Sequence, residues 1–110
     1  MRDAQRRDQI FVALACERRR VALSLLSDHQ ELTLPDLADE IAEREHRRSL
    51  TDIPPETVRE LYLELYHQHV PRLESADLVT YSQDQDRVAM TDLGREVERQ
   101  LLTPVESLLS

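Results

Sequence analysis

A long helical stripe followed by two short alternating runs constrains the fold of this chain more than any other feature. Over residues 56–73 the apolar side chains recur at helical spacing on one face. The residues of this stripe are Val58, Leu61, Tyr62, Leu65, His69 and Leu73. The pattern predicts a helix that begins at Pro54-Pro55 and runs to about Ala76. Pro71 is a candidate bend, because its ring removes a backbone hydrogen bond.

The segment after this helix has a different period. The runs "DLVTY" and "RVAMT" are rich in Val, Thr and Tyr, and the polar stretch "SQDQD" joins them. Such runs are typical of short β-strands, so the sequence predicts a hairpin. No glycine marks its turn, which leaves the turn geometry open.

Two shorter helices are predicted before residue 30. Residues 7–15 carry apolar side chains at helical spacing, and the run "ERRRVALSLLSDH" repeats the pattern as far as about Asp28. A break near Cys16 separates the two helices. Residues 31–34 alternate in polarity, which predicts a very short strand.

A further helix is predicted between this strand and the long helix. Thr33 is its expected N-cap, with Pro35 in the first turn and Asp36 three positions after the cap. The helical pattern then breaks in "EREHRRSLTDIPP" and does not return until the Pro54-Pro55 pair.

The last predicted element is a helix over residues 93–110, which bends or breaks at Thr103-Pro104. An apolar helix beyond a small core has little of its own domain left to cover, so we expect it to form a symmetric homodimer interface. The expected interface residues are Leu101, Leu102, Val105, Leu108 and Leu109. The alternative is that this helix folds back onto the first helix of the same chain.

The order of these elements predicts the class of fold. A helix–turn–helix that leads into an antiparallel hairpin is the layout of a winged helix-turn-helix, mainly α with a small β-hairpin. The chain has 110 residues, which suits one domain. We expect a flexible basic arm at residues 1–7, a winged-helix domain at residues 8–92 and the dimerisation helix at residues 93–110.

Two segments of the sequence resemble a known family. "ALACERRRVALSLLSDHQELTLPDLADEIAERE" and "LYHQHVPRLESADLVTYSQDQDRVAMT" are similar to small haloarchaeal winged-helix domains of largely unassigned function. The most specific parts are the three arginines after the first helix and the run "YHQHVPRL" that leads to "LVTY". The resemblance covers roughly residues 8–91 and implies a transcription regulator; metal- and redox-sensing repressors are more distantly similar. The family pattern has a glycine where this chain has Ala76-Asp77, and Asp tolerates the left-handed conformation that such a helix end needs.

The charged residues indicate adaptation to high salt. All 14 basic residues are Arg and none is Lys, against 22 Asp and Glu, which gives a formal net charge of -8. Arg is more weakly hydrated than Lys and pairs with carboxylates through a planar fork. At about 1 M salt, screening acts within about 3 Å, so an acidic surface repels itself little. We expect a halophilic archaeal source, because a GC-rich genome, the alternative, does not explain the acid excess.

Several classes of protein are disfavoured. Cys16 is the only cysteine, so an intrachain disulfide or a thiolate zinc cluster cannot form. No apolar run approaches the roughly 20 residues of a membrane span, and no signal-peptide pattern opens the chain. Gly-rich phosphate loops and serine-nucleophile motifs are also missing. We expect a cytoplasmic protein that is not an enzyme, uses no cofactor and does not contact a membrane.

The histidines and the cysteine have structural roles in this interpretation. His67 and His69 are two residues apart on the predicted helix, so they diverge and cannot hold one metal ion together. We expect no metal site, with His69 in the core and His67 at the surface. For Cys16 we expect a small buried side chain, with an oxidant-sensing thiol as the alternative.

The long helix has the place of a DNA-reading helix, but its polar face carries acids. Glu60 and Glu64 would face phosphates of their own sign, and Glu reads only the amino group of cytosine. Three interpretations follow. The protein binds DNA in molar salt, where repulsion is screened; or it holds DNA mainly through the arm and loops; or it is a protein–protein interaction module that does not bind DNA. Under the first two it is a transcriptional regulator that binds double-stranded DNA.

The candidate DNA-binding residues are Arg6, Arg7, Arg47, Arg48, Thr57, Arg59, His67 and Arg87. Four of them discriminate between a regulator and an interaction module: Arg47, Arg48, Arg59 and Arg87. Their convergence on one convex face would favour DNA binding, whereas pairing of each with a carboxylate would favour the interaction module.

Three consecutive arginines, Arg18, Arg19 and Arg20, resemble a phosphate clamp. Consecutive helix residues spread over about 200°, however, so these side chains cannot all face one surface. We expect one or two of them to pair with Glu17, Asp28 or the acids of residues 36–45.

Overall fold

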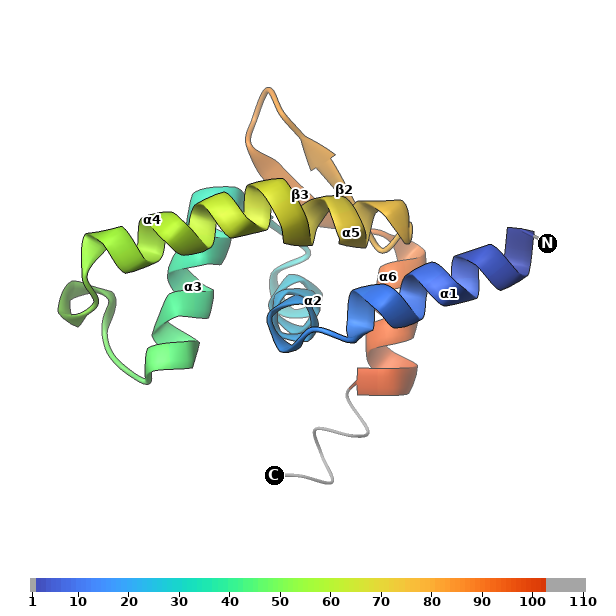
Figure 1. Cartoon of the computed structure of the whole chain (residues 1–110), viewed down its shortest axis with the longest axis horizontal. Helices are drawn as coiled ribbons and strands as arrows, with labels where there is room; N and C mark the ends of the chain where they lie inside the picture. The colour runs from blue at the N-terminus through green and yellow to red at the C-terminus, as the bar shows by residue number, and fades with distance from the viewer. Residues whose placement is uncertain (1, 103–110) are drawn as a thin grey trace.

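Helices make up most of the structure, a computed structural model that describes residues 2–102 (Figure 1). The elements are α1 (Arg2–Leu14), α2 (Glu17–His29), β1 (Glu31–Thr33), α3 (Leu34–His46), the 3-10 turn η1 (Leu50–Asp52), α4 (Pro55–Glu64), the π-helical η2 (Leu65–His69), α5 (Val70–Ser75), β2 (Val79–Ser82), β3 (Arg87–Met90), α6 (Asp92–Val97) and the π-helical η3 (Glu98–Leu102).

The three strands form one small antiparallel sheet with the order β1-β3-β2. Val88 of β3 lies between Leu32 of β1 and Tyr81 of β2. The hairpin between β2 and β3 is confirmed, and it turns without glycine because Asp86 adopts a left-handed φ of 49°. Its N–H donates to the carbonyl of Gln83 at 3.3 Å, which closes the turn.

The predicted long helix is continuous from α4 through η2 to α5 (Figure 1). The distortion expected near Pro71 takes the form of a π-helical turn just before it, in which the N–H of Val70 donates to the carbonyl of Leu65. A proline ring collides with the carbonyl four residues earlier, here that of His67, and a wider turn relieves this contact.

The core lies between α2, α3, the long helix and the sheet. In Figure 1 α2 is seen nearly end-on below the long helix, and residues of both elements are fully buried. The largest fully buried side chains are Leu23, Leu26, Leu34, Leu37, Ile41, Leu65, Leu73, Leu78, Val79 and Val88. The predicted stripe of the long helix is confirmed: its members are buried, or half-buried against the core at Val58 and Tyr62.

Side chains at the helix ends follow the sequence-based expectations. The hydroxyl of Thr33 accepts from the N–H of Asp36 at 3.2 Å, so Thr33 caps α3. Asp77 adopts a left-handed φ of 60° after α5, as expected for the residue that ends this helix. At α6, Thr91 is the cap and accepts from the N–H of Gly94 at 2.9 Å. A Cβ atom at Gly94 would lie 2.1 Å from the carbonyl oxygen of Leu78, so this position requires glycine.

The two ends of the described chain correct the predicted domain limits. α1 begins at Arg2, so residues 2–7 are helical instead of a flexible arm. η3 follows α6 directly, and Leu102 is buried in the core of its own chain, where η3 packs against α2. Leu102 is therefore removed from the predicted dimer interface, whereas Leu101 is exposed. Three further interface residues lie outside the described part of the chain: Val105, Leu108 and Leu109.

Within residues 2–102, every helix is too short or too polar to cross a lipid bilayer.

Candidate functional site

A carboxylate in the hairpin holds the long helix and the sheet together. Asp86 accepts the phenol O–H of Tyr62 from α4 at 2.7 Å, and its other oxygen accepts the O–H of Tyr81 from β2. The backbone carbonyl of Asp86 also accepts the N–H of Leu34 at 2.7 Å, which adds the start of α3. The hydrogen bond to Asp86 is the main cause that raises the pKa of Tyr62. For Tyr81 burial is the main cause that raises the pKa, and the hydrogen bond to Asp86 raises it further.

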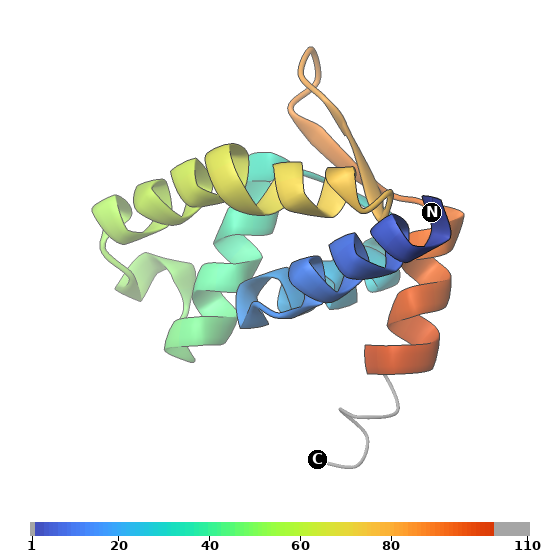
Figure 2. The same ribbon diagram turned by 45° about the vertical axis from the view of Figure 1, so that its right-hand side comes forward.

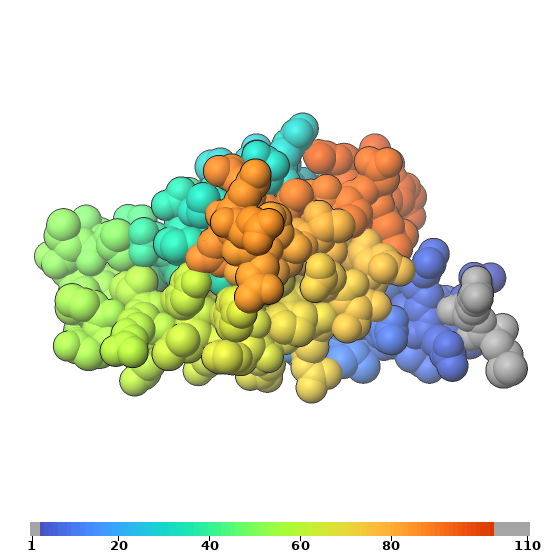
Figure 3. Space-filling view, turned by 90° about the horizontal axis from the view of Figure 1, so that it is seen from above, coloured from blue at the N-terminus to red at the C-terminus, as the bar shows by residue number. Residues whose placement is uncertain are grey.

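Aromatic packing reinforces this junction. The ring of Tyr66 meets that of Tyr81 edge to face, with ring centroids 6.1 Å apart. Figure 3 shows the result from above, with the hairpin (orange) standing beside the long helix (green to yellow) on one face of the molecule. Helix and hairpin thus form one preset surface.

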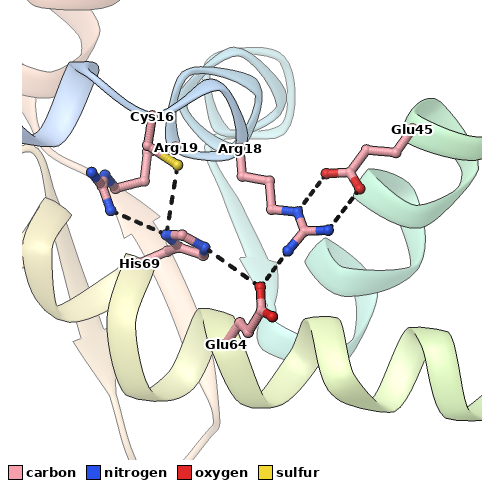
Figure 4. A network of polar contacts seen from close by, with 6 residues as sticks. All are labelled: Cys16, Arg18, Arg19, Glu45, Glu64 and His69. Atoms are coloured by element: carbon pink, nitrogen blue, oxygen red, sulfur yellow. Dashed lines mark hydrogen bonds and ion pairs between the residues drawn. The ribbon is translucent and has the colours of Figure 1, made fainter.

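The polar face of the long helix is less acidic toward solvent than its sequence suggests. Glu64 accepts a hydrogen bond from Arg18 of α2, so its charge is paired within the protein (Figure 4). Glu60 is exposed and has no ion-pair partner among the residues that the structure describes. Of the two acids predicted to oppose DNA on this face, one is therefore paired, although Arg18 shares its single positive charge between Glu64 and Glu45.

Arg18 connects three helices. Its Nε lies 2.6 Å from one carboxylate oxygen of Glu45 in α3 and its Nη2 lies 2.9 Å from the other, while Nη1 bonds Glu64 in α4. The hydrogen bond to Glu45 is the main cause that raises the pKa of Arg18. The prediction that one or two of the three arginines pair with Glu17, Asp28 or the acids of residues 36–45 is confirmed at Arg18.

The other two consecutive arginines close the end of α1. Arg19 donates from Nε to the carbonyl of Ala13 at 2.7 Å and from Nη2 to that of Val12 at 3.0 Å. Arg20 donates to the carbonyl of Leu14 at 2.7 Å. The last carbonyls of a helix lack the usual partner from a following turn, although that of Val12 also accepts from the N–H of Ala15 at 3.3 Å, so both side chains act as a C-terminal cap. The three arginines are thus structural and form no phosphate clamp.

His69 is buried in the same network, as predicted, with 4% of its surface exposed (Figure 4). Its Nδ1 lies 3.2 Å from Nη1 of Arg19. A guanidinium can only donate, so Nδ1 accepts and the neutral ring carries its proton on Nε2. Burial lowers the pKa of His69, and the positive charges of Arg19 and Arg18 lower it further. Cys16 is half-buried with Sγ 4.0 Å from Nδ1, so it is neither fully buried nor free on the surface.

The basic residues predicted to bind DNA fall into separate groups. Arg47 and Arg48 follow α3 and are exposed. They line one surface hollow of about 510 Å³ together with Arg44 and two carboxylates, Glu40 and Glu43. Arg47 has a left-handed φ of 52° as the C-cap of α3. Arg59 is exposed on α4 and borders a different, largely apolar groove of about 400 Å³ between α3, η1 and α4.

Among residues 2–102, two of the arginines predicted to bind DNA form ion pairs with carboxylates, and the others do not. Arg87 lies 3.2 Å from Glu31 on the neighbouring strand, and Arg6 lies 3.4 Å from Asp77. Within the described part of the chain, the others carry no ion pair: Arg7, Arg47, Arg48 and Arg59. The four discriminating arginines are thus neither gathered in one hollow nor all neutralised.

The remaining two predicted residues lie on opposite halves of the long helix. Thr57 is half-buried in the first turn of α4. His67 is exposed, as predicted, and its ring meets that of Tyr66 edge to face with centroids 4.9 Å apart. Between residues 2 and 102, no group of three or more His, Cys, Asp and Glu side chains is placed to hold a metal ion.

Sequence reasoning did not find the junction at Asp86. Its partners Tyr62 and Tyr81 are separated from it by 24 and 5 residues, and no local spacing links a tyrosine of a helix to an aspartate of a hairpin. The only signal in the sequence is an aspartate in a turn without glycine, which is a position for a left-handed residue.

The elements together define a mainly helical protein with a small three-stranded antiparallel sheet, in which half-buried polar contacts join the sheet to a long helix. Residues 11–89 match the family model described as "Domain of unknown function (DUF7344)", and the chain belongs to this DUF7344 family. No curated protein and no solved structure matches the chain.

Proposed function

We propose that this protein is a DNA-binding transcriptional regulator with a winged helix-turn-helix fold, in which α3 and the long helix form the helix–turn–helix and the β2–β3 hairpin forms the wing. The element order and the antiparallel sheet support this assignment. The observation that carries the function is the junction at Asp86, because it holds a long helix and an adjacent hairpin in one orientation. Recognition elements that are preset in this way lose little entropy on binding.

Charge pairing reduces the objection that an acidic helix repels DNA. Glu64 is bonded to Arg18, which lowers the negative potential at the surface of the long helix, although Arg18 also pairs with Glu45. Arg47 and Arg48 lie just before that helix and are available for phosphate contacts. In the cytoplasm of a halophilic archaeon, salt would screen the remaining acids.

The proposed roles of the predicted residues follow from their places. Arg47 and Arg48 contact the DNA phosphates. Arg59 and His67 of the long helix face the major groove of the DNA, and Thr57 supports the start of that helix. Three other arginines have secondary roles, because they are paired or lie far along the chain from the helix–turn–helix: Arg6, Arg7 and Arg87.

The test is fluorescence anisotropy with labelled duplexes, one random and one from the region upstream of the gene, from low to molar KCl. We expect binding that prefers one sequence and persists in molar salt. Arg48→Ala should weaken binding to both duplexes alike and reduce its salt dependence, as loss of a phosphate contact does. Arg59→Ala should reduce the ratio of the affinity for the upstream duplex to the affinity for the random one.

Arg72→Ala is the matched control, because Arg72 is exposed on α5 and has no ion-pair partner among the described residues. Its substitution removes the same charge from the side of the long helix that faces α1, where Arg72 lines a hollow with Asp8 and Val12. If Arg72→Ala and Arg48→Ala lowered the affinity for DNA equally, the net charge of the protein would explain both losses. That result would contradict the phosphate contact assigned to Arg48. Absence of binding at every salt concentration, by protein with a folded circular-dichroism spectrum, would refute DNA binding.

A protein–protein interaction module is the second candidate function. Glu60 on the long helix and Asp84 at the hairpin tip are exposed acids without ion pairs in the described chain, so both parts of the proposed surface carry negative charge. Such a surface suits a basic protein partner better than a phosphate backbone. Failure of the DNA experiment together with binding to a basic protein would favour this function.

A further inference from the structure

We infer that α1 is a self-association surface, on which a second copy of the chain binds through its own α1 in an antiparallel pair. This inference does not depend on the proposed function. It starts from the only phenylalanine of the chain, Phe11, which is 64% exposed on α1. Val12 beside it is 48% exposed. Single exposed apolar side chains are common, so the inference rests on how the neighbours of Phe11 on α1 complement it.

One side of α1 is already occupied by the rest of the molecule. α1 lies along the outside of the fold in Figures 1 and 2, where it packs against α2 and α5. Ala13 is buried, Ile10 is half-buried and Arg6 reaches Asp77 after α5. At about 100° per residue, Phe11 points about 160° away from Ala13, about 140° away from Arg6 and about 100° away from Ile10. Among residues 2–102, the exposed side of α1 is therefore unpartnered.

The exposed side is complementary to itself in one antiparallel register. In this register a two-fold axis passes between residues 7 and 8. Residue 7 of one copy then lies opposite residue 8 of the other, and residue 11 lies opposite residue 4. Phe11 of one copy then faces Ala4 of the second copy, and Arg7 faces Asp8. A large side chain thus meets a small one, and opposite charges meet, at both symmetry-related ends of the interface.

Burial and pairing of these residues in the single chain agree with this register. All four are exposed: Ala4, Arg7, Asp8 and Phe11. Within the described chain neither Arg7 nor Asp8 has an ion-pair partner, although Arg6 next to them has one. Charge complementarity of a surface with its own two-fold copy favours a second chain as the occupant over an unrelated partner.

The experiment is sedimentation velocity of the full chain over about a hundredfold range of concentration. We expect a monomer–dimer equilibrium. Phe11→Ala should weaken the dimer by at least about a hundredfold, because two buried rings are lost per dimer. Phe11 is exposed in the single chain, so this change leaves the fold intact, which circular dichroism checks. Leu101→Ala is the control, since Leu101 is exposed at 47% on η3 and belongs to the C-terminal surface predicted from the sequence.

A charge exchange tests the register itself. Arg7→Asp alone places two pairs of like charges across the interface and should weaken the dimer by about tenfold. The double variant Arg7→Asp/Asp8→Arg exchanges the two charges and should restore the affinity. A monomer at every concentration, loss of the dimer in Leu101→Ala but not in Phe11→Ala, or no rescue by the double variant would each overturn the proposal.

Discussion

Replacement of Asp86 by asparagine isolates the contact that joins the hairpin to the long helix. The carboxylate accepts two phenol hydrogen bonds, one from Tyr62 and one from Tyr81. Asparagine has nearly the same shape, but its amide nitrogen can only donate, so one phenol loses its acceptor. Asparagine also tolerates the left-handed conformation at this position, where φ is 49°, so Asp86→Asn adds no backbone strain.

The expected loss follows from the two bonds. A hydrogen bond to a charged group in a half-buried site stabilises the fold by about 1.5 kcal/mol, so the wild-type pair contributes about 3 kcal/mol. One neutral bond of about 1 kcal/mol remains in Asp86→Asn, which leaves a decrease of about 2 kcal/mol in the free energy of unfolding. For a chain of this size the midpoint temperature should fall by about 8 to 10 °C.

Urea unfolding followed by circular dichroism measures this change, and Asp84→Asn is the matched control. Asp84 lies in the same hairpin loop, is exposed and has no ion-pair or hydrogen-bond partner within residues 2–102. Its substitution should shift stability by less than about 0.5 kcal/mol. If Asp86→Asn were no more destabilising than Asp84→Asn, the junction would not hold hairpin and helix together.

Three further predictions concern Gly94, His69 and the tyrosines. Gly94→Ala should cost at least about 2 kcal/mol in urea unfolding, because its Cβ would lie 2.1 Å from the carbonyl oxygen of Leu78; an unchanged midpoint would contradict this. The lowered pKa of His69 means that the unfolded chain binds a proton more readily, so the free energy of unfolding should fall as pH drops below about 6.5, and His67→Gln should keep this dependence. The raised pKa values of Tyr62 and Tyr81 give stability that is complete below about pH 10 and is lost above it, as pH-dependent thermal melts would show; Tyr81→Phe should reduce that alkaline loss.

The acidic long helix illustrates where sequence reasoning reached its limit. Periodicity placed Glu60 and Glu64 on one polar face, and both are indeed exposed to some extent. Periodicity could not reveal that Arg18, 46 residues earlier, reaches Glu64, because the pairing depends on how α2 packs against α4. Nor could it show that Arg19 and Arg20 cap α1, since the carbonyls that they bind become available only where that helix ends.

What the sequence determined by itself was local: the helix over the stripe from Val58 to Leu73, the cap at Thr33 and the hairpin runs. Hydrophobic period and capping chemistry act over a few residues, so they can be read along the chain. The tertiary structure decided the rest: the addition of β1 to the hairpin, the acceptor role of Asp86 and the burial of Leu102 in its own core. These features arise from contacts between residues far apart in sequence, and which surfaces meet depends on the packing of the whole chain.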